Sequence, residues 1–132
     1  IELFYRLFFT LAPDDKFIKE NIEKSLYIID DSGKKEYANL REKGFYNQLI
    51  SSNSMVTVHA DSIKIDSEKR KFIYYGKETI NRKSAIIIRN LITEGFFEDM
   101  IRSPKNPHGV LLKNWRIIDN TEVSNEAKYN SF

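Results

Sequence analysis

The sequence predicts an α+β domain in which three N-terminal helices pack against a strongly curved, four-stranded antiparallel sheet. Apolar residues recur at helical spacing up to about residue 51, and from Ser54 they alternate with polar residues, which is the period of a strand. The segment Asn106-Pro107-His108-Gly109 then separates two long apolar stretches and has the composition of a type I turn. The chain of 132 residues suffices for one domain, which we place at residues 1–123, followed by a polar C-terminal tail at 124–132.

The first predicted helix spans residues 1–11 and is apolar around most of its circumference. Only Glu2, Arg6 and Thr10 interrupt its apolar residues. It is too short and too charged to cross a bilayer and too apolar for a free surface helix. We therefore expect the end of a longer helix that is buried on most sides.

Two further helices are predicted before the strands begin. Proline and two carboxylates at residues 13–15 form a helix-start signal, since proline fits the first turn and carboxylates stabilise the positive end of the dipole. This helix is expected to end at residues 31–33, and a third helix covers 34–51, with Gly44 as a weak point inside it. The two apolar stripes consist of Ile18, Ile22, Leu26 and Ile29, and of Tyr37, Leu40, Phe45, Leu49 and Ile50.

Four strands follow, and two of them are predicted to be irregular. The apolar phase of the first strand changes after Ala60, which predicts a bulge near Asp61-Ser62. The third strand is unusually long, so Gly95 is expected to mark a bend. From Asp119 onward the chain is polar enough to fray. The predicted strands cover residues 54–65, 71–80, 85–102 and 110–123.

Composition excludes some chemistry without naming a function. The chain has no cysteine, so thiol catalysis, zinc–thiolate sites and disulfides are impossible. A net charge of +2, with 41% hydrophobic and 30% charged residues, is ordinary for a globular domain and makes no general case for nucleic acid. Because Ile1 already falls within an apolar helical pattern, we expect the chain to be a fragment of a longer protein.

Catalytic and metal sites have few candidates. His59, Asp61 and Asp66 are the possible general bases along the first strand, and none stands in a nucleophile or metal-binding motif. The pairs Asp14-Asp15 and Asp30-Asp31 invite a metal interpretation, but both lie at helix ends, where capping and the dipole account for them. We therefore expect no enzyme activity, no metal and no cofactor.

Four segments resemble the TraK family of Bacteroides-type conjugative transposons, in nearly the same order and spacing. They are Leu7–Asp14, Glu42–Asn47, Tyr75-Gly76 and the turn Asn106–Gly109. The turn and the following Trp115-Arg116-Ile117 are also similar to the bitopic inner-membrane scaffold subunit of type IV secretion systems. The order of elements further resembles the cone-shaped folds of the nuclear-transport-factor-two type.

The resemblance implies a non-enzymatic assembly component of a conjugative, DNA-transferring type IV secretion apparatus. Proteins of this family have a short cytoplasmic start, one transmembrane helix and a periplasmic domain that assembles with itself and with other subunits. By this resemblance the chain is the periplasmic domain, anchored at the inner membrane by a helix outside this sequence. Its expected partners are other transfer-apparatus subunits and, weakly, further copies of itself, without direct binding of nucleic acid. The alternative is a small-ligand-binding or catalytic domain of the same cone-shaped fold.

Three sets of residues are predicted to matter for assembly. A turn motif fixes the register of the last hairpin. The first helix exposes an aromatic patch, which is typical of an interface. The first and third strand connections meet at one end of the sheet and form a basic surface, suited to lipid headgroups or an acidic subunit rather than DNA. The turn motif is Asn106, Pro107, Gly109 and Trp115, the interface is Phe4, Tyr5, Phe8 and Phe9, and the basic surface is Lys69, Arg70, Lys71, Arg102 and Lys105.

Overall fold

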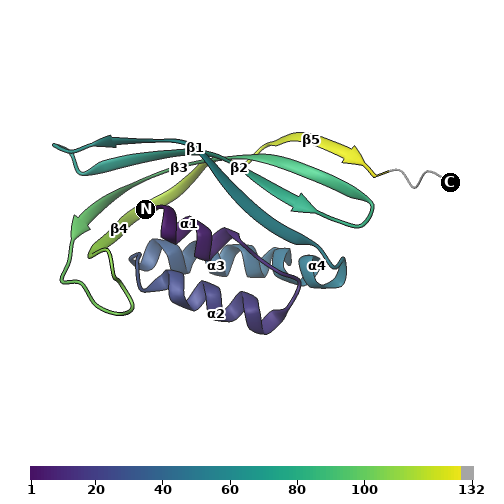
Figure 1. Cartoon of the computed structure of the whole chain (residues 1–132), viewed down its shortest axis with the longest axis horizontal. Helices are drawn as coiled ribbons and strands as arrows, with labels where there is room; N and C mark the ends of the chain where they lie inside the picture. Colours follow the sequence, from purple (N-terminus) through teal and green to yellow (C-terminus); the bar gives the residue numbers. More distant parts are fainter. Residues whose placement is uncertain (129–132) are drawn as a thin grey trace.

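The structure is a computed structural model that describes residues 1–128. Helices precede strands along the chain, as the change of period predicts (Figure 1). The helices are α1 (Glu2–Phe9), α2 (Asp15–Leu26), α3 (Asp31–Glu42) and α4 (Phe45–Ser51), and the strands are β1 (Met55–Asp66), β2 (Lys71–Asn81), β3 (Ala85–Asp99), β4 (Val110–Asp119) and β5 (Glu122–Ala127).

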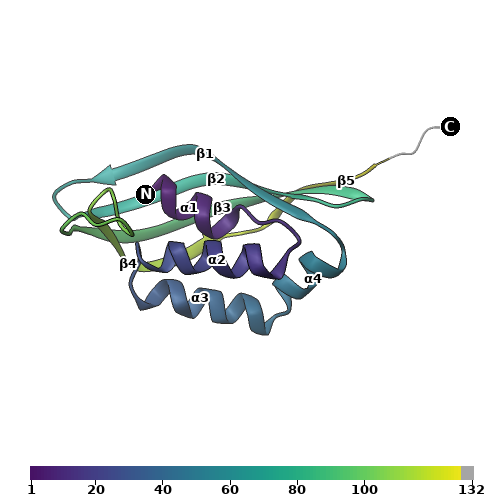
Figure 2. The same ribbon diagram turned by 60° about the horizontal axis from the view of Figure 1, so that its bottom comes forward.

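The domain has two layers, a twisted antiparallel sheet and a set of helices that cover one of its faces (Figures 1 and 2). The strand order is β1-β2-β3-β4, and β5 also pairs with β3. β3 pairs with β4 and β5 along the same edge: its residues 85–89 pair with β5, and its residues 92–99 pair with β4. The predicted class, α+β with a curved antiparallel sheet against N-terminal helices, is confirmed.

The helical layer contains four helices where three were predicted. Gly44 has a φ of +78° and forms the N-cap of α4, so the helix predicted over 34–51 is interrupted there. A left-handed backbone conformation cannot continue a right-handed helix. Residues 31–33 begin α3 instead of ending the preceding helix, because the Asp30 carboxylate accepts the Ser32 N–H at 3.0 Å and caps α3.

The first helix is shorter than the predicted span of 1–11. α1 ends at Phe9, and Leu11 pairs with Val56 of β1 through two backbone hydrogen bonds of 2.9 and 2.8 Å. The residues after the helix thus cover the beginning of an edge strand.

Both predicted irregularities of the sheet are present. The register of β1 against β2 shifts between Ala60 and Ser62, which confirms the bulge. The register of β3 against β4 shifts between Glu94 and Phe96, on either side of Gly95. These shifts bend the sheet around the helical layer.

The predicted fourth strand is divided into two strands. The Asp119 carboxylate accepts the Thr121 N–H at 2.8 Å, and this side-chain turn ends β4. Residues 122–127, which were expected to fray in part, form β5 and pair with β3. The tail predicted at 124–132 therefore begins inside β5, and residues 129–132 lie outside the described residues.

An aromatic cluster fills the space between α1 and the sheet. The rings of Tyr5 and Tyr74 stack with their centroids 3.7 Å apart. The Tyr5 hydroxyl accepts a hydrogen bond of 3.1 Å from the Trp115 indole and shares another with Thr93, while burial raises its pKa. Side chains therefore fill the space between α1 and the sheet. The other α1 rings that pack against Trp115 are Phe4, Phe8 and Phe9.

Candidate functional site

The turn Asn106–Gly109 closes the connection between β3 and β4. The Gly109 N–H donates to the Asn106 carbonyl at 3.2 Å, and the buried Asn106 amide donates to the Val110 carbonyl at 2.9 Å. Gly109 has a φ of +64°, and a Cβ at this position would lie only 2.8 Å from the Met100 carbonyl oxygen. A residue with a side chain would thus strain the backbone and displace its neighbour. The hairpin predicted around this turn is present, with residues 100–109 as its connection.

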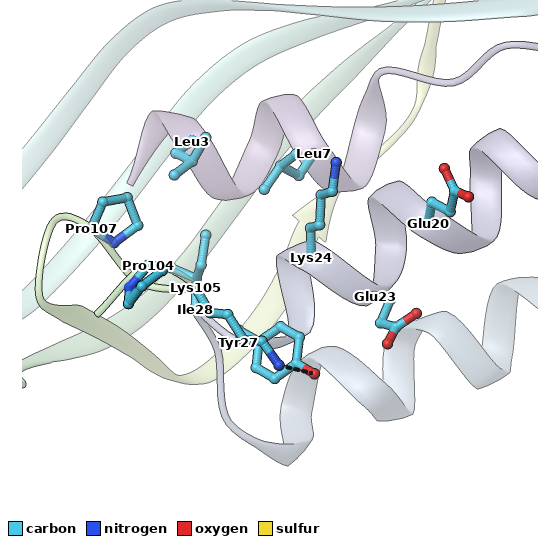
Figure 3. Close-up of a pocket in the computed structure, with 10 residues that line it drawn as sticks. All are labelled: Leu3, Leu7, Glu20, Glu23, Lys24, Tyr27, Ile28, Pro104, Lys105 and Pro107. Carbon is cyan, nitrogen blue, oxygen red and sulfur yellow. Dashed lines mark hydrogen bonds between the residues drawn. The ribbon is translucent and has the colours of Figure 1, made fainter. Parts of the chain in front are cut away.

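This connection forms one wall of a groove whose other walls are α1 and α2 (Figure 3). The groove is open, mostly apolar, and has a volume of about 540 Å³. Charged side chains of α2 lie along its edge, as expected for a surface with an apolar centre and a polar rim. We call it the Leu3–Leu7 groove. It is lined by Leu3, Leu7, Glu20, Glu23, Lys24, Tyr27, Ile28, Pro104, Lys105 and Pro107.

Tyr27 and Lys105 cross one end of the groove. The Lys105 ammonium donates to the Tyr27 hydroxyl at 3.1 Å and lies 4.3 Å from the centre of its ring (Figure 3). The Tyr27 side chain remains 43% exposed, which makes it one of the large apolar groups on the surface. Tyr27 was not predicted as a site residue, although it is an aromatic residue outside the apolar stripe, directly after the end of α2, which is a pattern visible in the sequence.

The aromatic residues predicted as an interface lie in the core. Phe4, Tyr5, Phe8 and Phe9 are each at most 4% exposed. Because α1 packs between the sheet and α2, it buries two neighbouring faces where one was expected. The prediction that these four side chains are exposed is therefore wrong. The partly exposed face of α1 carries Leu3 and Leu7, which line the groove.

The predicted basic residues are divided among different contacts, and Lys105 lies on Tyr27 in the groove. The first connection lies beside the end of β3, since the Phe97 N–H donates to the Arg70 carbonyl at 2.9 Å. Arg70 pairs with Asp99 at 2.9 Å, and Lys71 with Glu94 at 3.4 Å, so carboxylates offset two of these charges. A binding role for Lys69, Arg70, Lys71, Arg102 and Lys105 stays a prediction.

The possible general bases do not share an enclosed site. The His59 side chain is 82% exposed and lies 3.9 Å from Asp61, which also pairs with Lys77 at 3.3 Å. Asp66 accepts the backbone N–H groups of the following turn at 3.1 Å. Within residues 1–128, no three histidine or acidic side chains come together as metal ligands. These residues therefore provide no recognisable catalytic constellation.

The first carboxylate of each pair caps a helix. Asp14 accepts the Lys16 N–H at 3.0 Å and begins α2, one residue after the proline that was predicted to lie in the first turn. Asp30 begins α3 and also accepts the Asn114 N–H of β4 at 3.1 Å. Burial opposes ionisation of Asp30, but its hydrogen bonds from Ser32 and Asn114 outweigh this effect and lower its pKa. These contacts explain Asp14 and Asp30 by helix capping, as predicted from the sequence.

Comparison with known proteins finds a similar fold in several solved structures. No protein-family model matches the sequence, and no curated protein matches it. Among solved structures, the soluble domain of TrwG from the type IV secretion machinery of Bartonella grahamii is similar, with a TM-score of 0.73 and 12% identity, over 91% of this chain and 90% of that one. The VirB8 protein of Agrobacterium tumefaciens has a TM-score of 0.70 and 10% identity, over 91% and 88% of the two chains. TraE, solved in complex with 2-(2-furyl)isonicotinic acid, has a TM-score of 0.70 and 10% identity, over 90% and 91%.

These similarities extend over nearly the whole of each chain and establish a shared fold. The identities are too low to carry residue roles from one protein to another. Among the described residues, no helix is long and apolar enough to cross a bilayer.

Proposed function

We propose that this chain is a non-enzymatic assembly domain of a conjugative type IV secretion apparatus. The observation that carries the proposal is the fold, shared along about nine tenths of both chains with a component of type IV secretion machinery. The domain acts through protein–protein contacts on the periplasmic face of the inner membrane. A single transmembrane helix outside this sequence anchors it there, and its partners are other subunits of the transfer apparatus.

The narrower assignment to the TraK family is supported by where the resembling segments lie. Three of them contain a glycine that the local geometry demands. Gly44 and Gly109 have φ values of +78° and +64°, and a Cβ on Gly76 would lie 2.6 Å from the His59 carbonyl oxygen. Residues needed to build the backbone are the ones that distant members of a family are expected to share.

The function is tested by removing the full-length protein from a donor cell and measuring the frequency of DNA transfer. We expect transfer to be lost and to return with the wild-type gene. A pulldown of the full-length protein from donor cells should recover other transfer-apparatus subunits. Normal transfer without the protein would contradict the proposal.

The absence of catalysis is tested separately with His59→Ala. Because the His59 side chain is 82% exposed and lies outside any enclosed site, we expect the variant to transfer DNA at the wild-type frequency. Loss of transfer by a variant that folds and accumulates normally would reveal a catalytic or binding role.

The Leu3–Leu7 groove is the surface that we propose for assembly, because it combines exposed apolar side chains with Pro107 of the turn motif. Tyr27→Glu places a charge in the groove, and Ile118→Glu is a matched control on the outer face of the sheet, since the two side chains are 43% and 50% exposed. When the full-length protein is crosslinked in cells, we expect the ladder of oligomers to disappear with Tyr27→Glu and to persist with Ile118→Glu. A membrane anchor raises the effective concentration, so an interface that is weak in solution can still be occupied there. Loss of the ladder only with Ile118→Glu would move the interface to the sheet.

A further inference from the structure

A second hollow lies at the C-terminal end of α1, between the α3–α4 region and the inner face of the sheet. It has a volume of about 300 Å³ and is more enclosed than the Leu3–Leu7 groove. The rings of Phe8, Phe9 and Phe45 form apolar walls, and Tyr46 and Glu78 are among its polar residues. We call it the Glu78 cavity. A cavity of this size and lining suits a small molecule.

Glu78 is a buried carboxyl group with incomplete hydrogen bonding. Its side chain projects from the inner face of β2 and is 3% exposed. One carboxyl oxygen, Oε1, accepts a hydrogen bond of 3.2 Å from the Asn120 amide. Arg89 is its direct neighbour on β3, and the charge of Arg89 favours the ionised form of Glu78. Burial raises the pKa of Glu78, because the effect of burial outweighs the Asn120 hydrogen bond and the charge of Arg89.

Tyr46 brings an unsatisfied hydroxyl group to the same cavity. The residue is 6% exposed, and its hydroxyl has no hydrogen-bond partner among the described residues. Burial is the main cause that raises its pKa, and the nearby carboxylates Glu36 and Glu78 add to the effect. A buried hydroxyl without a partner is unfavourable, so a native protein normally satisfies it.

The charges around the cavity are balanced. Glu36 and Glu78 supply two carboxyl groups, and Lys43 and Arg89 supply two cations. Neither sign of charge dominates the lining, and burying an ion between the phenylalanine rings would be costly, so we expect an uncharged ligand to be favoured.

We propose that the Glu78 cavity binds a small uncharged molecule that carries a carboxamide group beside an apolar ring. The amide N–H donates to the carboxyl group of Glu78, and the amide carbonyl accepts from the Tyr46 hydroxyl. The ring occupies the space between the phenylalanine walls. A carboxamide suits Glu78 in either protonation state, because it offers both a donor and an acceptor. This site is separate from the groove proposed for assembly, and no residue lines both.

The proposal is tested with benzamide as the probe, by two-dimensional NMR titration of the 132-residue chain. We expect saturable shifts at millimolar concentrations, centred on residues that line the cavity. Benzoate and toluene serve as controls, because both keep the ring. Benzoate lacks the neutral donor group, and toluene lacks all polar atoms. Both controls should bind at least about tenfold more weakly than benzamide. Equal binding of toluene, or shifts centred on the Leu3–Leu7 groove, would overturn the proposal, and so would no saturable shift.

Variants test the role of the hydroxyl group. Tyr46→Phe should weaken benzamide binding roughly tenfold, whereas Tyr27→Phe, which removes a hydroxyl from the groove, should leave it unchanged. The thermal midpoint of Tyr46→Phe should equal or exceed that of the wild type, because the substitution breaks no hydrogen bond. Unchanged benzamide affinity in folded Tyr46→Phe contradicts the proposal. If this variant fails to fold, the binding of benzamide, benzoate and toluene to the wild-type chain still tests the proposal.

Discussion

Glu78 and Glu94 lie on neighbouring strands of one sheet, but they face opposite sides and differ in chemistry. On the inner face, under the helices, burial raises the pKa of Glu78. On the outer face, Glu94 accepts a hydrogen bond of 2.6 Å from the Arg116 guanidinium and pairs with Lys71 at 3.4 Å, and these contacts lower its pKa. The face on which a side chain lies therefore determines whether the same carboxyl group is a buried acceptor or an ion-pair partner.

The two faces also differ in what they contribute to stability. The inner face carries the fully buried residues of β2 and β3, such as Phe72, Tyr74 and Leu91. The outer face combines half-buried isoleucines, such as Ile88 and Ile92, with charged pairs in contact with water. We expect substitutions on the inner face to have large effects and those on the outer face to have small ones.

Adjacent residues of β4 give the strongest test of this difference. Trp115→Ala removes an indole that is 4% exposed and packs against Phe4 and Phe8, so it should destabilise the fold by about 3–5 kcal/mol. Arg116→Ala, one position away on the outer face, should have a much smaller effect. Urea unfolding of both variants provides the measurement. Similar losses of stability would show that the outer face is more than a solvated surface.

The turn fixes which residues of β4 face the helices and which face the solvent. A shift of the register by one residue would exchange the inward-facing and outward-facing residues. Gly109→Val combined with Pro107→Ala should lower stability by about 1–3 kcal/mol, since the valine must adopt a positive φ beside the Met100 carbonyl oxygen. Conjugation by the full-length variant should fall as well. Gly44→Val separates the two causes, because Gly44 also has a positive φ but nothing lies within 4 Å of its added Cβ, so this variant has the backbone strain without the clash. If the double variant melts and transfers DNA like the wild type, the turn does not control the register.

Glu78→Gln should stabilise the domain more at high pH than at low pH. The pKa of Glu78 is raised in the folded state, so its favourable contribution is present below the ordinary glutamate pKa and is lost as the pH rises through the folded value. Replacement by a neutral isostere removes this loss and keeps an oxygen for Asn120 to bind. We expect a clear gain in the unfolding midpoint at about pH 8 and little change at about pH 5. A gain of the same size at both values would contradict a raised pKa.

Glu94→Gln should show the opposite pH dependence with the smallest effect of the four. The pKa of Glu94 is lowered by its hydrogen bond with Arg116, so its contribution is present above the ordinary glutamate pKa and is lost as the pH falls. The variant should be slightly less stable than the wild type near about pH 7, and this difference should shrink toward about pH 3. Added salt should shrink it too, because the pair is on the surface. The same stability as the wild type at low salt and neutral pH would show that the ion pair is inconsequential.

Local patterns in the sequence predicted the class of fold and several of its details. The change of period at Ser54 separates helices from strands, the phase change after Ala60 corresponds to the bulge, and Gly95 lies at the irregularity of β3. Each of these features depends on backbone geometry within a few residues, so a short window of sequence contains the necessary information. The turn at Asn106–Gly109 belongs to the same group, because glycine and proline restrict the backbone where they stand.

By itself, then, the sequence determined that helices precede strands and where the sheet is irregular, whereas the number of elements, their burial and their pairing were decided only by the tertiary structure. The sequence shows that α1 is apolar, but packing between the sheet and α2 places Phe4 and Phe8 in the core and leaves Leu7 at the groove. The polar strand β5 exists because β3 offers it a backbone partner, and Glu78 is buried because α3 and α4 cover it. These outcomes depend on residues far apart in the chain, and hydrophobic patterning within one segment contains no information about the neighbours that will cover it.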